Sequence, residues 1–113
     1  MSFRILPLKP FLKELKHLSK KYPSIKDDLR KLGEDLALNP RSGVAIGKNC
    51  YKIRLQITSK GKGKSGGARI ITHFLVAFEN ETLFLLKIYD KGDQENISDT
   101  ELTYLLKSIT DDK

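Results

Sequence analysis

The spacing of apolar residues changes once along this chain, and that change limits the folds open to it. Up to about residue 38 the apolar residues recur every three or four positions, as on one face of an amphipathic helix. From residue 51 they alternate with polar residues, as in a strand with one buried face. The change predicts helices packed against a sheet, which is the α+β class.

The helical part divides into two segments. Pro10 suits the first turn of a helix, and the first apolar stripe ends directly before Pro23. Ser24 predicts the start of a second helix that ends near Asn39. So short a connection predicts a helical hairpin. The two stripes are Phe11, Leu15, Leu18 and Tyr22, and then Ile25, Leu29, Leu32 and Leu36.

Four strands and a last helix complete the expected order. The apolar residues 3–8 form an N-terminal strand, and further strands are expected at about 51–58, 68–78 and 82–89, with a tight turn at 79–81. Ser98 predicts the cap of a short C-terminal helix. We therefore expect one domain, residues 1–113, with the N-terminal strand and the helices packed on one face of a mainly antiparallel sheet.

Basic residues concentrate in the middle of the chain. Between Leu36 and Phe78 there are eight Lys and Arg and no Asp or Glu, whereas the whole chain has 21 basic and 14 acidic residues and a net charge of +7. Excess charge gathered in one segment attracts a polyanion, and nucleic acid is the leading candidate. The eight cations are Arg41, Lys48, Lys52, Arg54, Lys60, Lys62, Lys64 and Arg69.

Strand alternation assigns side chains to the two faces of the expected sheet. The set expected to face the helices is Ile70, Thr72, Phe74, Val76 and Phe78, with Phe84, Leu86 and Ile88. The set expected on the opposite, open face is Lys52, Arg54, Arg69, Ile71, His73, Lys87, Tyr89 and Lys91. Leu75, Leu83 and Leu85 should share this open face, so it could also receive an apolar partner.

Several kinds of site are disfavoured. The run Gly61–Ser65 resembles a phosphate loop, but Thr58 stands where that motif needs glycine, and a strand follows instead of a helix. We interpret it as a basic loop that contacts phosphates or is merely solvated. A single cysteine, Cys50, excludes an internal disulfide and a cysteine-rich metal site. His73 is either a proton-transfer group or a half-buried strand residue.

Neither a membrane span nor a cofactor is expected. No run of eighteen apolar residues occurs, and the N-terminus lacks the apolar segment of a secretory signal. We therefore expect a cytoplasmic protein without a membrane partner. Two separated histidines and one cysteine do not make a metal site.

Three ordered segments of the chain resemble the RelE/ParE superfamily of bacterial toxins from toxin–antitoxin pairs. They are CYKIRL at residues 50–55, GARII at 67–71 and LKIYDK at 86–91. The Lys and Gly insertion before Gly66, and Tyr89 and Lys91 followed by Glu95 and Asn96, resemble the HigB-type branch.

The resemblance implies a small α+β toxin that enters the ribosomal decoding site and cuts mRNA there without a metal ion. Its partners would be a cognate antitoxin, the ribosome and mRNA. Lys52, Arg54 and Arg69 match basic positions of the family, and Lys91 falls near another. The chain departs from RelE at Gly92, Asp93, Ile97 and Ser98, so the RelE acid–base arrangement does not transfer.

Metal-free RNA cleavage requires a proton acceptor and cations that stabilise charge on the phosphate. The expected catalytic roles are phosphate clamping by Arg54 and Arg69, proton acceptance by Lys52 or Lys91, and orientation or stacking by Tyr89. The expected RNA contacts are Lys60, Lys62, Lys64, Lys87 and His73. Two alternatives stay open: a non-catalytic ParE-like inhibitor of DNA gyrase, and a plain RNA-binding module.

Overall fold

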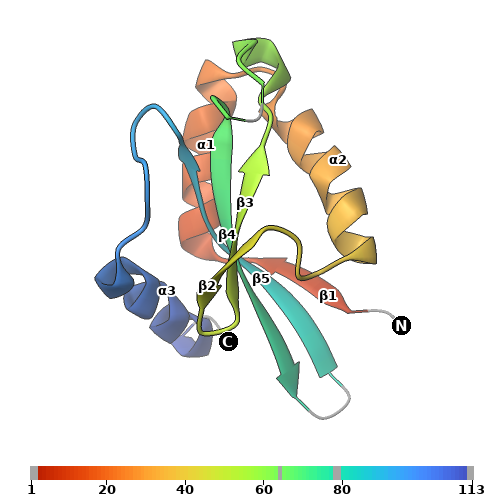
Figure 1. Ribbon diagram of the computed structural model, residues 1–113, viewed down its shortest axis with the longest axis vertical. Coiled ribbons are helices and arrows are strands. Elements are labelled where there is room, and N and C mark those ends of the chain that lie inside the picture. Colours follow the sequence, from red (N-terminus) through yellow and green to blue (C-terminus); the bar gives the residue numbers. More distant parts are fainter. Residues whose placement is uncertain (1–2, 64, 78–79, 112–113) are drawn as a thin grey trace.

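The structure is a computed structural model that describes residues 3–63, 65–77 and 80–111 (Figure 1). Its strands are β1 Arg4–Pro7, β2 Val44–Gly47, β3 Cys50–Leu55, β4 Ala68–Ala77 and β5 Asn80–Asp90. Its helices are α1 Lys9–Lys21, α2 Ile25–Leu38 and α3 Asp99–Asp111, with a short 3₁₀ turn, η1, at Thr58–Lys60. No helix within the described ranges combines the length and apolar character needed to cross a bilayer.

The strands form one sheet in the order β1-β5-β4-β3-β2. Among the described strands only β1 runs parallel to its neighbour, β5, so the sheet is mainly antiparallel, as the sequence predicts. The edge strand β2 was not predicted. It is only four residues long and joins β3 through Lys48 and Asn49, which both have a positive φ. That conformation is typical of two-residue hairpin turns whose twist matches the strands they join.

The helical hairpin begins and ends where the sequence signals place it. Pro10 lies in the first turn of α1, which ends at Lys21, before Pro23. Asp27 and Asp28 lie in the first turn of α2, where acidic side chains favour the helix dipole. Both helices pack on one face of the sheet over a buried core. The core contains Phe11, Leu18, Tyr22, Ile25, Leu36, Ile53, Leu55, Ile57, Ala68, Ile70, Phe74, Leu83, Leu85 and Ile88.

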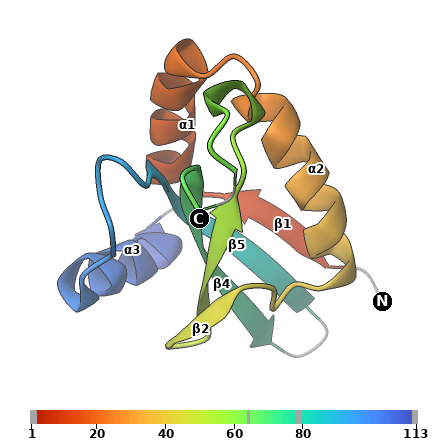
Figure 2. The ribbon, with the colours of Figure 1, turned by 45° about the horizontal axis from the view of Figure 1, so that its top comes forward.

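Helix α3 packs on the opposite face, which corrects the expectation that all helices share one face. Figures 1 and 2 show α3 on the other side of the strands from α2. A second buried cluster lies beneath it. The cluster consists of Leu8, Cys50, Ile71, Phe84, Leu86, Tyr89, Leu102 and Leu105. The predicted open face is therefore covered in part, because its apolar residues need a partner to leave water.

A β-bulge in β5 explains why four side chains lie on the face of the sheet opposite to the one predicted. Ile71 lies opposite Lys87 but Thr72 lies opposite Leu85, so Leu86 has no counterpart on β4. Such an extra residue exchanges the two faces of the strand beyond it. The four side chains concerned are Leu83 and Leu85, which pack under α1 and α2, and Phe84 and Leu86, which pack under α3.

The prediction of an apolar patch on the open face is consequently wrong. Leu83 and Leu85 are 0% and 6% exposed, and of the three expected members only Leu75 reaches the surface. Residue Val76, expected to face the helices, is half exposed near the end of β4. Phe78 and Glu79 of the predicted strand and turn lie outside the described residues.

Candidate active site

Two rows of side chains cross the three central strands on the α3 side of the sheet. In one row, Arg54 of β3 lies opposite Arg69 of β4, which lies opposite Tyr89 of β5. In the next row, Lys52 and Lys87 flank Ile71. Strand alternation predicted this grouping correctly, because β3, the first part of β4 and the end of β5 keep one register.

A hollow of about 540 Å³ opens beside the first row and is lined by Gly43, Val44, Lys52, Arg54 and Arg69. Gly43 has a φ of 98°, and a Cβ there would lie 2.4 Å from the carbonyl oxygen of Lys52. Only glycine permits this close approach of the chain entering β2 to β3. Among the described residues that line it, the hollow thus presents three cations and no carboxylate, a lining suited to a phosphate group.

Arg69 is held more tightly than an open-face residue would be. It is only 5% exposed, and its guanidinium donates to the carbonyl oxygens of Ala68 and Ser65, each at 3.1 Å. These main-chain acceptors fix the side chain before any ligand arrives. A donor that is already oriented stabilises developing charge without reorganising.

Tyr89 is buried, with 4% of its surface exposed, and within the described part of the chain its hydroxyl has no hydrogen-bond partner. Burial raises the pKa of Tyr89; Arg69 opposes this effect and Glu101 adds to it. The phenol therefore stays neutral near pH 7 and can donate a proton but not accept one. Its expected stacking role is disfavoured, because Lys87 lies over the ring with its Nζ 5.9 Å from the centroid.

Residues after β5 supply polar partners for the lysines of this face. Lys87 forms a close ion pair with Glu101 of α3, Lys91 lies 3.4 Å from a Glu95 oxygen, and Lys52 Nζ donates to Asn96 Oδ1 at 3.0 Å. The sequence prediction missed Asn96 and Glu101 as members of the site. The spacing of Ser98 and Glu101 does match a capping box, and Ser98 Oγ accepts from the Glu101 N–H.

The expected RNA contact Lys60 is placed elsewhere. Its Nζ lies 2.7 Å from Asp90 Oδ1, in a cluster where the Tyr22 hydroxyl donates to Asp90 Oδ2 at 2.6 Å. Burial would raise the pKa of Asp90, but hydrogen bonds from Lys60, Tyr22 and the Gly92 N–H outweigh it and lower that pKa to about 2. Lys60 is therefore a partly buried structural cation and not a freely solvated one.

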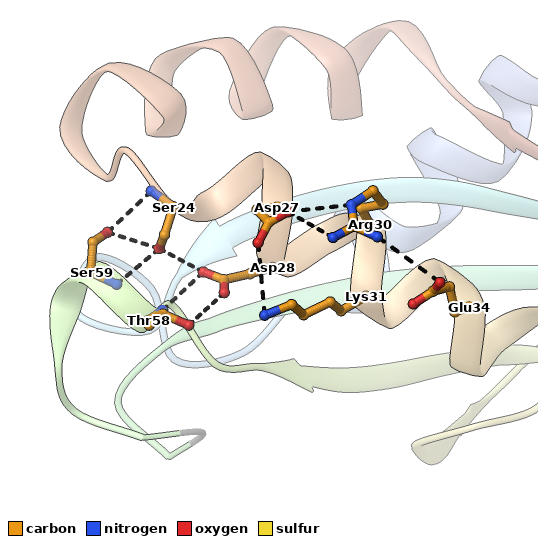
Figure 3. A network of polar contacts seen from close by, with 8 residues as sticks. All are labelled: Ser24, Asp27, Asp28, Arg30, Lys31, Glu34, Thr58 and Ser59. Carbon is orange, nitrogen blue, oxygen red and sulfur yellow. Dashed lines mark hydrogen bonds and ion pairs between the residues drawn. The ribbon is translucent and has the colours of Figure 1, made fainter.

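The loop between β3 and β4 is anchored a second time, to α2 (Figure 3). The buried Asp28 accepts hydrogen bonds from the Thr58 N–H at 2.9 Å, the Thr58 hydroxyl at 2.6 Å and the Ser24 hydroxyl at 2.7 Å. Both anchors hold the start of the basic loop. Of its other lysines, Lys62 is exposed, and Lys64 lies outside the described residues.

His73 lies away from the cationic hollow, beside Cys50 and Phe84. Its ring stacks on Phe84, its Nδ1 is 3.5 Å from Cys50 Sγ, and burial lowers its pKa. Burial also raises the pKa of the Cys50 thiol to about 11. These contacts favour a packing role for His73. In the described ranges no group of three or more His, Cys, Asp or Glu is placed to hold a metal ion.

Fold and site together define a small basic α+β protein with a cationic hollow and a buried tyrosine on its sheet. Residues 24–111 match the family described as the RelE toxin of the RelE / RelB toxin-antitoxin system, and the chain belongs to this family. The match confirms the prediction of a translation-inhibiting toxin of the RelE/ParE superfamily. The HigB-type branch stays a prediction.

A solved structure of E. coli toxin RelE, a double mutant in the free state, is similar to this chain. The TM-score is 0.59 at 19% sequence identity, and the alignment covers 96% of this chain and 99% of that one. The likeness confirms the predicted fold class.

Proposed function

We propose that this toxin acts in the cytoplasm and arrests translation by cutting mRNA on the ribosome, without a metal ion. Family membership supports a toxin, and one observation supports the cleavage chemistry. A hollow is lined by Lys52, Arg54 and Arg69, and Tyr89 is the strand neighbour of Arg69. The Tyr89 hydroxyl packs under α3, does not line the hollow, and lacks a partner among the described residues. A buried unsatisfied hydroxyl costs about 1 to 3 kcal/mol, so its retention calls for a reason such as catalysis.

In the proposed reaction the 2′-hydroxyl of a nucleotide attacks its own 3′-phosphorus. The new O2′–P bond forms as the P–O5′ bond breaks, the 2′-oxygen loses a proton, and the leaving 5′-oxygen gains one. Arg54 and Arg69 stabilise the growing charge on the phosphate oxygens. Lys52 is the favoured proton acceptor because it lines the hollow, while Lys91 faces Glu95. Tyr89, kept neutral by its raised pKa, is the candidate donor to the leaving oxygen.

Binding to RNA would involve fewer lysines than the sequence prediction named. Lys62 is exposed and free to contact a phosphate backbone, and Lys87 could do so if it exchanged Glu101 for phosphate. Lys60 is not proposed as an RNA contact, because it forms an ion pair with Asp90. We also propose that the cognate antitoxin inhibits the toxin by covering or distorting the cationic hollow, with acidic residues opposite its cations.

The test is cleavage of mRNA on programmed ribosomes by the wild type and by Arg69→Lys, which keeps a buried positive charge. Loss of the two-pronged guanidinium should slow cleavage by about 10²- to 10³-fold. The matched control is Arg41→Lys, since Arg41 lies 4.7 Å from the ring of Phe74 and lines no part of the hollow. Its rate should not change.

Three outcomes would contradict the proposal. A folded Arg69→Lys variant that cuts at the normal rate would remove Arg69 from the chemistry. A wild type that binds ribosomes without cutting would favour the RNA-binding module. Expression that stops DNA supercoiling before it stops translation would favour the gyrase inhibitor.

A further inference from the structure

A second, smaller hollow adjoins the cationic one and shares Lys52 with it. Its volume is about 180 Å³. Two stretches distant in sequence line it: the β2–β3 hairpin, with Ile46 and Lys52, and residues 96–102, with Asn96, Ile97, Asp99 and Leu102. Whatever occupies this hollow therefore lies next to the cationic hollow.

The lining combines apolar walls with a few polar groups. Ile46, Ile97 and Leu102 supply apolar surface, and Asn96 and Asp99 supply hydrogen-bonding groups. Pockets for drug-sized ligands measure roughly 300 to 1,000 Å³, so this hollow suits a single small ring system. Unstacked RNA bases are recognised in this way, between flat or apolar side chains and with polar groups at the base edge.

The orientation of Asn96 follows from its neighbour. Lys52 has only donors, so the oxygen of the Asn96 amide faces it, and the amide nitrogen is left to donate elsewhere. Asp99 offers the complementary acceptors. In the described part of the chain no side chain donates to its carboxylate, whereas Glu95 and Glu101 each face a lysine.

Asp99 is exposed, so water can solvate its carboxylate. A carboxylate still repels a phosphate bound nearby, because like charges repel. A carboxylate is favourable beside a base, because it can accept hydrogen bonds from the N–H groups of that base. Asp99 also lies in the first turn of α3, where it favours the helix dipole. That effect accounts for an acidic residue at this position but not for a hollow that joins it to Asn96 and the apolar walls.

We propose that this hollow binds the base of a nucleotide flanking the phosphate in the cationic hollow, and that it prefers guanine. The inference rests on the proposed function. The N1–H and N2–H groups of guanine would donate to the two oxygens of Asp99, and its O6 would accept from the amide nitrogen of Asn96. Uracil offers only one N–H donor and forms fewer of these bonds. Asn96 and Asp99 are thus specificity-determining residues.

The experiment is an NMR titration of the ¹⁵N-labelled full chain with the guanosine, adenosine, cytidine and uridine monophosphates. Each is used as the 3′- and the 5′-phosphate, since the base can lie on either side of the phosphate. Shifts should appear at Asn96, Ile97 and Asp99, and a guanosine monophosphate should bind at least about tenfold more tightly than its uridine counterpart.

The variant Asp99→Asn should abolish this preference, and uridine monophosphate should bind no more weakly than to the wild type, because the variant removes a negative charge near the phosphate. Its matched control is Asp93→Asn, an exposed acid of the same segment that lines neither hollow; this variant should keep the preference. Equal binding of all four nucleotides by the wild type, no shifts around Asn96, or an unchanged preference in Asp99→Asn would overturn the inference.

The titration needs neither ribosomes nor cleavage, so it separates this inference from the proposed function. A guanine preference without mRNA cleavage would support the base site and refute the nuclease. Cleavage on ribosomes without any base preference in the titration would support the nuclease and refute the base site. Where both hold, the cut positions should show guanine beside the cleaved bond, and Asp99→Asn should lose that enrichment.

Discussion

Replacing Lys60 with methionine tests the buried cluster that holds the basic loop against the end of β5. The Lys60 side chain is 14% exposed and that of Asp90 is 2% exposed, so the ion pair is largely shielded from water. Removing one partner of a buried pair costs about 3 to 5 kcal/mol. We expect about 3 kcal/mol at pH 7, the lower end, because Tyr22 and the Gly92 N–H still donate to Asp90.

The pH dependence gives this prediction a second signature. The pKa of Asp90 lies at about 2 against an ordinary value of 3.8, which corresponds to about 2 kcal/mol of stability. Because the folded pKa is the lower one, this stability is present above about pH 4 and is lost as the pH falls towards 2. In Lys60→Met the pKa of Asp90 should rise, so stability should fall less steeply over that range.

The assay is urea unfolding at a series of pH values between 2 and 7, followed by circular dichroism. Lys62→Met is the matched control, because Lys62 is an exposed lysine of the same loop; its stability should stay within about 0.5 kcal/mol of the wild type. If Lys60→Met were as stable as this control, or lost stability in acid as steeply as the wild type, the cluster would not stabilise the fold as argued.

Three further predictions concern the site and its supports. Tyr89→Phe should slow mRNA cleavage by about 10²- to 10⁴-fold. Its stability in urea should be unchanged or raised, because the lost hydroxyl has no partner in the described structure. Slower cleavage together with destabilisation would contradict a role as proton donor. Asp28→Ala should cost about 1 to 3 kcal/mol in urea unfolding, since it leaves the Thr58 N–H and hydroxyl without their acceptor. A smaller loss than for the exposed Asp27→Ala would show that the network is not stabilising. Lys62→Ala should make the salt dependence of RNA binding shallower by about one, while Lys60→Ala, provided that it folds, should leave that slope unchanged; the reverse result would restore Lys60 as a phosphate contact.

By itself the sequence determines the elements whose pattern is local. Pro10, Pro23 and Ser24 mark the hairpin, and the alternation from Tyr51 to Thr58 predicts β3, although the strand ends earlier, at Leu55. The same alternation places Arg54 and Arg69 on one face of neighbouring strands, because a strand of unbroken register repeats every two residues. The cationic surface of the toxin is thus encoded over a few consecutive residues of each strand.

Tertiary structure alone decides features that depend on contacts between distant segments. The bulge at Leu86 arises from pairing with β4, and it sends Leu83 and Leu85 to the core under α1 and α2. The position of α3 depends on the apolar residues of the face it covers, and this position brings Asn96 and Glu101 to the lysines. Likewise, only folding brings Lys60 to Asp90, thirty residues away. No spacing of residues in the sequence indicates such contacts, because their stabilising free energy comes from burying charged and apolar groups of distant segments against each other.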